Sequence, residues 1–197
     1  MTRHLPEQAR REQILSAARR RFIDKGYHPT RMDEIAHAAG LSKGGVYFHF
    51  ESKREVFETL VEEEYSRSMG FLEGVAGSEA PIAEKLQRLA THYLEYFGQA
   101  PEAPRFFVVM GEMALRDEAL AHRLREMQGA YMDAIARLLR QGEVEGVLRP
   151  VEARVVAGLL KALLDGIEGQ LAIGVPVDVP AHLAVGIDLV MNGLVRR

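Results

Sequence analysis

The feature that most constrains this chain is the segment 30–50, TRMDEIAHAAGLSKGGVYFHF, which contains two short helical stretches separated by a tight turn. Thr30 is a residue type that caps helices, and Asp33 follows three positions later, so the first helix is expected to begin here with a capping box. Gly40 supplies the left-handed backbone conformation that ends such a helix. The pattern therefore predicts a short helix followed at once by a turn.

The second helix of this segment is expected to begin after Ser42, whose hydroxyl can cap it. Val46 and Phe50 lie four residues apart and should form the buried side of this helix, and Phe48 is also expected in the core. Two short helices joined by a tight turn form a helix–turn–helix, whose second helix enters the major groove of DNA.

Positive charge is concentrated around this segment. Residues 1–54 contain 11 Lys and Arg against 6 Asp and Glu, whereas the rest of the chain contains 14 against 22. Residues 19–21 and 53–54 place basic clusters on both sides of the motif. This asymmetry favours a polyanionic partner at the amino-terminal end only. The alternative is an ordinary helical hairpin with a solvated basic face.

The DNA contacts are expected at the ends of the two motif helices. Thr30 and Arg31 lie at the start of the first helix, where the helix dipole favours a phosphate. Lys43 leads the second helix and is the best candidate for a base or phosphate contact, and the glycines that follow it allow the backbone to approach DNA closely. The predicted DNA-binding residues are Thr30, Arg31, Ser42, Lys43, Gly44, Gly45, Tyr47, His49 and Lys53.

A longer motif runs through the same region. It comprises Gly26-Tyr27, Thr30, Ile35-Ala36, Ala39-Gly40-Leu41-Ser42-Lys43-Gly44, Tyr47-Phe48-His49-Phe50 and Ser52-Lys53. This motif resembles the amino-terminal signature of the TetR family of transcriptional regulators. The resemblance assigns phosphate or thymine-methyl contacts to Tyr47 and His49 and a phosphate contact to Lys53. Position 45 departs from the family pattern, because Gly45 replaces a small side chain that can touch DNA.

The resemblance implies an all-α fold of about nine helices. It further implies an amino-terminal three-helix helix–turn–helix domain, residues 1–52, and a larger carboxy-terminal helical domain for ligand binding and dimerisation, residues 53–197. In this family the ligand cavity generally lies between the middle helices and the long helix that leads from the DNA-binding unit.

Periodicity predicts where these helices lie, because apolar residues recur at helical spacing between glycine- and proline-containing breaks. Ser52 followed by Glu55 predicts a capping box at the start of the long fourth helix. Residues 74–81 are expected to form a loop. Besides the two motif helices, the expected helices are residues 7–25, 52–73, 81–98, 104–115, 117–142, 152–173 and 181–195.

Composition restricts the class of protein. The chain of 197 residues is 47% apolar, which suffices for a packed core, and it contains no cysteine, which excludes disulfides and thiolate metal sites. It has no apolar run long enough to span a membrane, and its start lacks the apolar centre of a signal peptide. A cytoplasmic protein is therefore expected, with no metal and no cofactor.

The last two expected helices predict a homodimer. Apolar residues surround most of the helix at 152–173, and a helix that is apolar on all sides needs partners on all sides. Two such helices from each subunit can form a four-helix interface around a two-fold axis. The alternative is a lone bundle with an apolar end. The predicted interface residues are Leu159, Ala162, Leu163, Gly166, Ile187, Val190 and Leu194.

The middle helices predict an apolar cavity, because methionine and aromatic side chains cluster on three consecutive helices and adapt to varied apolar ligands. The alternative for each of these residues is ordinary core packing. His92, His122 and Arg88 are candidates for polar contacts. The predicted cavity residues are Tyr93, Tyr96, Phe97, Phe106, Phe107, Met110, Met113, Met127 and Tyr131.

These features together predict a sequence-specific repressor that an apolar or amphipathic molecule releases from double-stranded, palindromic operator DNA. The stretches GEMALRD, VLRP and LLDG resemble fatty-acid- or acyl-CoA-responsive members of the family, which suggests such an effector. A helical-bundle enzyme and a small-molecule-binding protein without an operator are the alternatives. The chain contains no HExxH motif and no glycine-rich phosphate loop after a strand, and residues 62–64 are expected to form a solvated acidic face.

Overall fold

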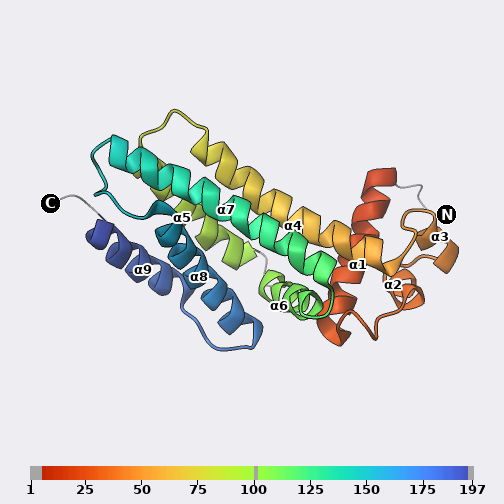
Figure 1. Ribbon diagram of the computed structural model, residues 1–197. Helices are drawn as coiled ribbons and strands as arrows, with labels where there is room; N and C mark the ends of the chain where they lie inside the picture. The colour runs from red at the N-terminus through yellow and green to blue at the C-terminus, as the bar shows by residue number, and fades with distance from the viewer. Residues whose placement is uncertain (1–5, 100–101, 195–197) are drawn as a thin grey trace.

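The computed structural model describes residues 6–99 and 102–194, and within these ranges the chain is all-α, without a strand (Figure 1). None of the helices in this part of the chain is both long and apolar enough to cross a membrane. The helices are α1 (Glu7–Lys25), α2 (Met32–Ala38), α3 (Lys43–Tyr47), α4 (Lys53–Ala76), α5 (Ile82–Gln99), α6 (Ala103–Ala114), α7 (Glu118–Val144), α8 (Ala153–Ala172) and α9 (Val179–Leu194).

Within the described residues the expected nine helices are present, with small differences at their ends. α3 ends at Tyr47 and not near Phe50, so the recognition helix is shorter than expected. α4 continues through Gly74 to Ala76, so the predicted loop begins later. Ser52 caps α4 as predicted, since its hydroxyl accepts a hydrogen bond from the backbone N–H of Glu55 (3.1 Å).

The predicted capping role of Thr30 is wrong. Thr30 is buried, and its hydroxyl donates hydrogen bonds to the carbonyl oxygens of Gly26 (2.7 Å) and Arg21 (3.2 Å). At the start of α2, the backbone N–H of Arg31 instead donates to the carboxylate of Glu34 (2.9 Å). Thr30 therefore fixes the loop between α1 and α2, and its side chain does not face solvent.

The amino-terminal lobe has a core that extends beyond α1–α3. Phe22 of α1 packs edge-on against Phe57 of α4, with 5.6 Å between the ring centroids, and Phe57 contacts Phe106 of α6 at 5.7 Å. The first turns of α4 thus belong to the core of this lobe as much as to the body. A continuous apolar contact from α1 through α4 to α6 joins the lobe to the rest of the molecule.

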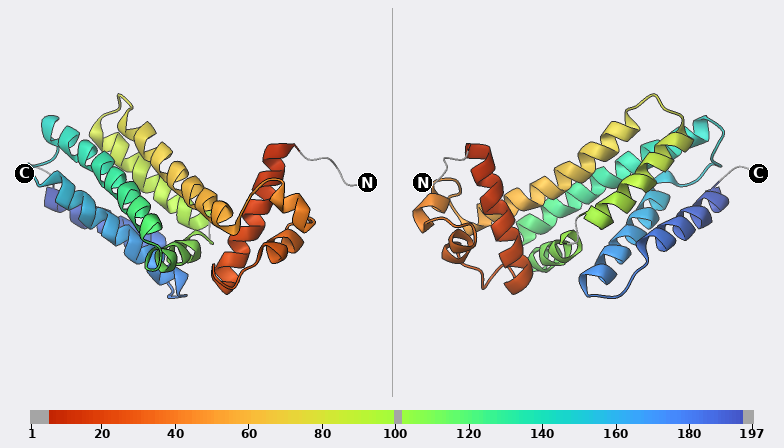
Figure 2. Two further views of the ribbon diagram at one scale, coloured as in Figure 1. Left: turned by 45° about the vertical axis from the view of Figure 1, so that its right-hand side comes forward. Right: turned by 180° about the vertical axis from the view of Figure 1, so that it is seen from behind.

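The body is a bundle in which α4 and α7 lie side by side and α8 packs against α6 and α7. Its core contains residues of α4, α5, α7 and α8, together with Leu148 of the α7–α8 connection. Figure 2 shows that the lobe of α1–α3 lies at one end of the elongated molecule and that α9 lies on an outer side, next to α8. The amino-terminal lobe and α9 therefore lie toward opposite ends of the described chain.

Gly142 marks the tightest packing in this body. A Cβ atom added at Gly142 would lie 2.6 Å from Cδ1 of the buried Leu148. We expect Gly142→Ala to lower the free energy of unfolding by roughly 1–3 kcal/mol, because overpacking outweighs the better helix propensity of alanine. Gly70→Ala in α4 is the matched control, since its Cβ would meet no atom within 4 Å. Denaturant unfolding of both variants checks this, and equal stabilities would contradict it.

Candidate functional site

The turn before α3 has the geometry that the sequence predicts. Gly40 has φ +65°, the left-handed conformation, and the hydroxyl of Ser42 accepts a hydrogen bond from the backbone N–H of Gly45 (3.1 Å). Val46 and Phe50 are fully buried. The buried side of α3 is therefore fixed, and its opposite side faces solvent.

Two polar side chains of α1 hold the motif helices in place. The side-chain amide of Gln13 donates to the carbonyl of Ala39, at the end of α2 (2.6 Å). The guanidinium of Arg11 donates to the carbonyl of His49, just beyond α3 (2.6 Å), and lies 4.1 Å from the centroid of the Phe50 ring. Because α1 itself packs into the core, these bonds give the recognition helix a defined orientation.

Lys43 and Tyr47 lie on the exposed side of α3, and the rings of Phe48 and His49 follow directly after the helix. Lys43 is exposed and its ammonium lies 5.9 Å from the centroid of the Tyr47 ring. The prediction that Phe48 lies in the core is wrong, because its side chain is 82% exposed. Phe48 and His49 stack edge-on with 5.1 Å between their ring centroids. Phe48 keeps helical backbone angles and follows the buried Val46 by two residues, about 200° around the helix, so its ring points away from the buried side.

The side chain of Lys53 makes its contacts within the protein, whereas the family resemblance assigned it a contact with a DNA phosphate. Its ammonium donates to the carbonyl oxygens of Tyr27 (2.8 Å), His28 (3.0 Å) and Thr30 (2.7 Å), and it lies 4.4 Å from the centroid of the Tyr27 ring. Burial lowers the pKa of Lys53. All three hydrogen atoms of the ammonium have acceptors within the protein. Lys53 therefore holds the α1–α2 loop against the start of α4.

One arginine of the basic cluster 19–21 also turns inward. Arg19 forms an ion pair with Glu64 of α4 (2.6 Å), and its guanidinium lies 4.8 Å from the centroid of the Phe106 ring of α6. Both members of the ion pair are largely buried, with 14% and 11% of their side chains exposed. The prediction that Glu64 belongs to a solvated acidic face is wrong. Arg19 connects α1 to two helices of the body.

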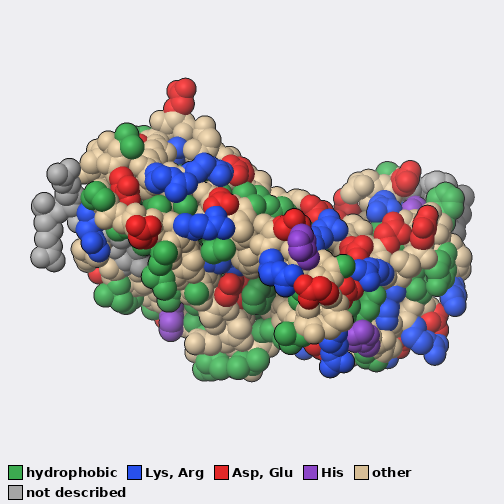
Figure 3. Space-filling model, in the orientation of Figure 1, with side chains coloured by type: hydrophobic (Ala, Val, Ile, Leu, Met, Phe, Trp, Pro, Cys, Tyr) green, Lys and Arg blue, Asp and Glu red, His purple; other side chains and the backbone are tan. Residues whose placement is uncertain are grey.

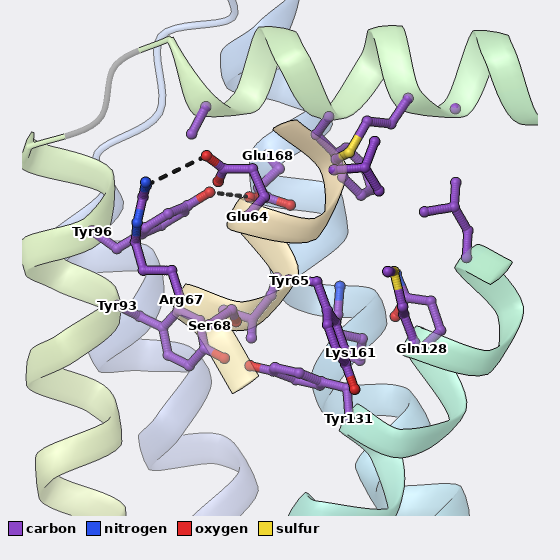
Figure 4. Close-up of a pocket in the computed structure, with 18 of the residues that line it drawn as sticks. Glu64, Tyr65, Arg67, Ser68, Tyr93, Tyr96, Gln128, Tyr131, Lys161 and Glu168 are labelled. Atoms are coloured by element: carbon purple, nitrogen blue, oxygen red, sulfur yellow. Dashed lines mark hydrogen bonds and ion pairs between the residues drawn. The ribbon is translucent and has the colours of Figure 1, made fainter. Parts of the chain in front are cut away.

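A cavity of about 330 Å³ lies in the body among α4, α5, α6, α7 and α8. Figure 4 shows tyrosines from α5 and α7 and charged side chains from α4 and α8 turned toward it. We call it the first cavity. Its lining consists of Val61, Glu64, Tyr65, Arg67, Ser68, His92, Tyr93, Tyr96, Phe97, Ala103, Phe107, Met110, Gly111, Leu124, Met127, Gln128, Tyr131, Lys161, Leu164 and Glu168.

All but two of the predicted cavity residues lie on this cavity. The exceptions are Phe106 and Met113, which are buried in the core of the amino-terminal lobe, so the prediction for them is wrong. On α6, Phe106 and Phe107 point in different directions because successive helical residues are about 100° apart. His92 lines the cavity, whereas His122 and Arg88 do not.

The family resemblance implied that the long helix α4 borders the cavity, but no lining residue was predicted on α4 or on α8. On α4 the lining residues Val61, Tyr65 and Ser68 lie at spacings of four and three, on the same side as the buried Leu72. This periodicity is visible in the sequence and was the available signal. On α8 the charged residues Lys161 and Glu168 stand one heptad apart within an apolar helix.

Glu168 is the most perturbed acid of this cavity. Its carboxylate accepts a hydrogen bond from the hydroxyl of Tyr96 (3.3 Å). Burial raises the pKa of Glu168 to about 7, partly opposed by the charge of nearby Lys161. Burial, followed by the charge of Glu168, raises the pKa of Tyr96, which therefore remains a donor. Perturbed acids in cavities are typical of functional sites.

The outer side of α8 and α9 is an apolar face that the described part of the chain leaves open. Val155, Leu159 and Leu163 are four residues apart on α8 and are each more than half exposed, as are Val185 and Leu189 on α9. Figure 3 also shows hydrophobic side chains along the lower edge of the body, where α8 meets α9. We call this surface the α8–α9 face.

Four of the predicted interface residues lie on α8, and three lie on α9. Leu159, Ala162, Leu163 and Gly166 are exposed. The side chains of Ile187, Val190 and Leu194 lie outside the described residues, although their backbone belongs to α9.

A helix–turn–helix lobe joined to a helical body is typical of one class of protein, the DNA-binding transcriptional regulators. Residues 14–60 match the profile described as bacterial regulatory proteins, tetR family, and residues 82–194 match the profile described as BetI-type transcriptional repressor, C-terminal. The chain belongs to the TetR family of transcriptional regulators.

Similar proteins agree with this assignment. The transcriptional repressor Rv1474c of Mycobacterium tuberculosis is 33% identical over 196 residues, which cover 96% of this chain and 94% of that protein. A transcriptional regulator from Saccharomonospora viridis in complex with choline superimposes with a TM-score of 0.82 at 23% identity, over 96% of this chain and all of the other. The SmeT–triclosan complex gives 0.79 at 25% identity, over 96% and 93%. SmeT represses a multidrug efflux pump of Stenotrophomonas maltophilia.

Proposed function

We propose that this regulator is a homodimeric repressor that binds a palindromic operator through α3 and leaves it when an apolar or amphipathic molecule occupies the first cavity. Its place of action is the cytoplasm, where the DNA lies. Fatty acids and acyl-CoA thioesters belong in the effector screen, together with compounds like those bound in the similar structures, choline and triclosan. Each part of the proposal depends on a different surface of the molecule.

The DNA surface in this proposal is the solvent side of α3. Lys43 is the candidate for base contact, and Arg31 lies exposed at the start of α2, where a phosphate is favoured. Tyr47 and His49 are proposed to contact phosphate groups or thymine methyl groups. Phe48 joins the set, because an exposed ring at the end of a recognition helix fits a thymine methyl group. The side chains of Thr30 and Lys53 do not belong to it.

The dimer in this proposal forms through the α8–α9 face. Large aliphatic side chains exposed at helical spacing on two adjacent helices favour a self-complementary interface around a two-fold axis. Two recognition helices related by this axis would meet successive major grooves, roughly 34–36 Å apart. A palindromic operator follows from that symmetry.

The observation that carries the proposed release mechanism is the environment of Arg19. Arg19 belongs to α1, yet its ion-pair partner Glu64 lines the first cavity, and its stacking partner Phe106 precedes the cavity residue Phe107. A molecule in the cavity that moves Glu64 or α6 therefore acts directly on the helix that holds α3. Release requires that the effector bind the two conformations with different affinity.

The proposal is tested by selecting an operator from random-sequence DNA with the full-length protein, and then titrating the complex with effector candidates. We expect a palindromic consensus and a loss of DNA affinity on effector binding. A tenfold loss corresponds to about 1.4 kcal/mol of coupling. Failure to enrich any sequence, at a salt concentration that suppresses non-specific binding, would contradict the proposal.

Lys43 and Lys53 are expected to behave differently on substitution. Lys53→Met should lower the free energy of unfolding by about 1–3 kcal/mol, because three carbonyl groups lose a charged donor, and should weaken all operators equally. Lys43→Ala should leave stability within about 0.5 kcal/mol and change the discrimination between operators. Thermal unfolding and operator-variant titrations check both. An unchanged melting temperature for Lys53→Met would contradict the structural role and favour the phosphate contact that the family resemblance implied.

A further inference from the structure

A second cavity, of about 380 Å³, lies next to the first one, between α5, α7, α8 and α9. Its walls are mostly aliphatic, and the residues that carry polar groups are Tyr93, Tyr131, Gln170 and His182. Its lining consists of Leu72, Leu86, Leu89, Ala90, Tyr93, Tyr131, Ile135, Leu138, Leu139, Leu160, Ala162, Leu163, Leu164, Gly166, Ile167, Gln170, His182, Leu183 and Gly186.

Tyr93 and Tyr131 belong to the walls of both cavities. Figure 4 shows their hydroxyl ends directed toward each other from α5 and α7. Leu164 of α8 also lines both. The two cavities are therefore neighbouring compartments, and only a few side chains stand between them. The first cavity has charged side chains in its wall, among them Glu64, Arg67 and Glu168, whereas the second cavity is mostly apolar.

The charged side chains that line the first cavity differ in whether they form an ion pair. The ammonium of Lys161 pairs with Asp165, and Arg67 lies 3.4 Å from Glu64, which Arg19 also neutralises. Within residues 6–99 and 102–194, Glu168 has no ion pair, and its hydrogen-bond partner is the neutral phenol of Tyr96. The charge of Lys161 reaches Glu168, but Asp165 already shares that ammonium, so a positively charged ligand group would stabilise the ionised carboxylate further.

Two aromatic rings of the first cavity already contact a cation. The ammonium of Lys161 already lies 5.8 Å from the centroid of the Phe107 ring and 5.5 Å from that of Tyr131. Aromatic faces attract cations, including quaternary ammonium groups that donate no hydrogen bond.

We infer that the two cavities form one site for an amphiphilic organic cation, whose ammonium lies at Glu168 and whose hydrocarbon chain passes between Tyr93 and Tyr131 into the second cavity. This inference rests on the proposed function, which makes the first cavity the effector site, and it selects a charge and a shape for the effector. It places cationic amphiphiles ahead of fatty acids, because within the described residues Glu168 is the charged lining residue of the first cavity that has no ion pair.

The site should respond to pH, because a cation pairs with the ionised form of Glu168. With a pKa of about 7, the carboxyl is about one-tenth ionised at pH 6 and about nine-tenths ionised at pH 8. Of the facing groups, burial lowers the pKa of His92, which favours the neutral form of its imidazole. The titratable and charged groups facing Glu168 are Glu64 and Arg67 on α4, His92 and Tyr96 on α5, Tyr131 on α7, and Lys161 and Asp165 on α8.

The test is calorimetric titration of the full-length protein with decyltrimethylammonium below its critical micelle concentration, with decanoate, and with tetramethylammonium. We expect decyltrimethylammonium to bind at least about tenfold more tightly than either of the others at pH 8, and about tenfold more weakly at pH 6 than at pH 8. Tighter binding of decanoate, or an affinity independent of chain length, would overturn the inference.

Two variants test separately where the ammonium group and the hydrocarbon chain of the ligand bind. Glu168→Gln should weaken decyltrimethylammonium about tenfold at pH 8 and remove the pH dependence, whereas Glu84→Gln, at an exposed position of α5, should change neither. Ala90→Phe should fill part of the second cavity and weaken the decyl compound without affecting tetramethylammonium. An unchanged affinity in either cavity variant would contradict the inference.

Operator binding by the ligand-free protein is measured separately, so that the proposed repressor function and the inferred cation site can be contradicted one without the other. If the protein binds its selected operator and a non-cationic compound releases it while decyltrimethylammonium does not bind, the cation inference fails and the proposed function stands. If no operator is enriched, the proposed function fails, and calorimetry alone decides whether the cation site exists.

Discussion

Replacing Leu159 with arginine is expected to separate the dimer into folded monomers and to abolish operator binding. Leu159 lies on the outward side of α8, is more than half exposed, and lines neither cavity. In a two-fold interface each substitution occurs twice, so two guanidinium groups would lose water and repel each other near the axis. Loss of the second half-site should then lower operator affinity by roughly 10²–10⁴-fold.

Sedimentation velocity at micromolar concentration and operator titration measure these two effects. Val144→Arg is the matched control, because Val144 is an exposed aliphatic residue at the end of α7, away from the α8–α9 face. It should leave both the dimer and the DNA affinity unchanged. A dimeric Leu159→Arg protein, or a monomeric unmodified protein at the same concentration, would contradict the proposed interface.

Replacing Arg19 with methionine is expected to separate effector binding from release. The variant keeps an apolar stem over Phe106 but loses the ion pair between α1 and Glu64. Because Arg19 does not line either cavity, effector affinity for the free protein should stay within about twofold. The loss of operator affinity caused by effector should fall from about tenfold or more to about twofold.

Linkage provides an independent measurement of the same coupling. Saturating operator DNA must weaken effector binding by the factor by which effector weakens operator binding. Arg123→Met is the matched control, since Arg123 of α7 pairs with Glu62 of α4 on the exposed surface, outside the amino-terminal lobe. Full coupling in Arg19→Met, or an equal loss in Arg123→Met, would show that the ion pair with Glu64 does not transmit the effect.

Local sequence determined the elements and their ends to within a few residues. The apolar periodicity of α1 and α7, the left-handed Gly40 and the caps at Ser42 and Ser52 each depend on residues close in the chain. The helix–turn–helix, the family and the α-helical class were predictable for that reason. Short-range backbone and capping energies do not depend on what packs from elsewhere.

Long-range contacts decided which side chains are free to act. Lys53 and Arg19 are basic residues beside the motif, and both were plausible DNA contacts by position alone. The folded chain brings three carbonyl groups to Lys53 and Glu64 to Arg19, across 23 or more positions in the sequence. A charge that finds buried partners is used within the protein, and only the packing shows whether such partners exist.

The same distinction separates core from cavity. Sequence predicted that methionines and aromatic residues of the middle helices would cluster, because each helix must bury its apolar side. Whether Phe106 or Phe107 meets a neighbouring helix or an open space depends on the rotation of α6 against α4 and α8, which hydrophobicity does not encode. The placement of Glu168 within reach of Tyr96, 72 residues away, likewise arose only when α5 and α8 packed together.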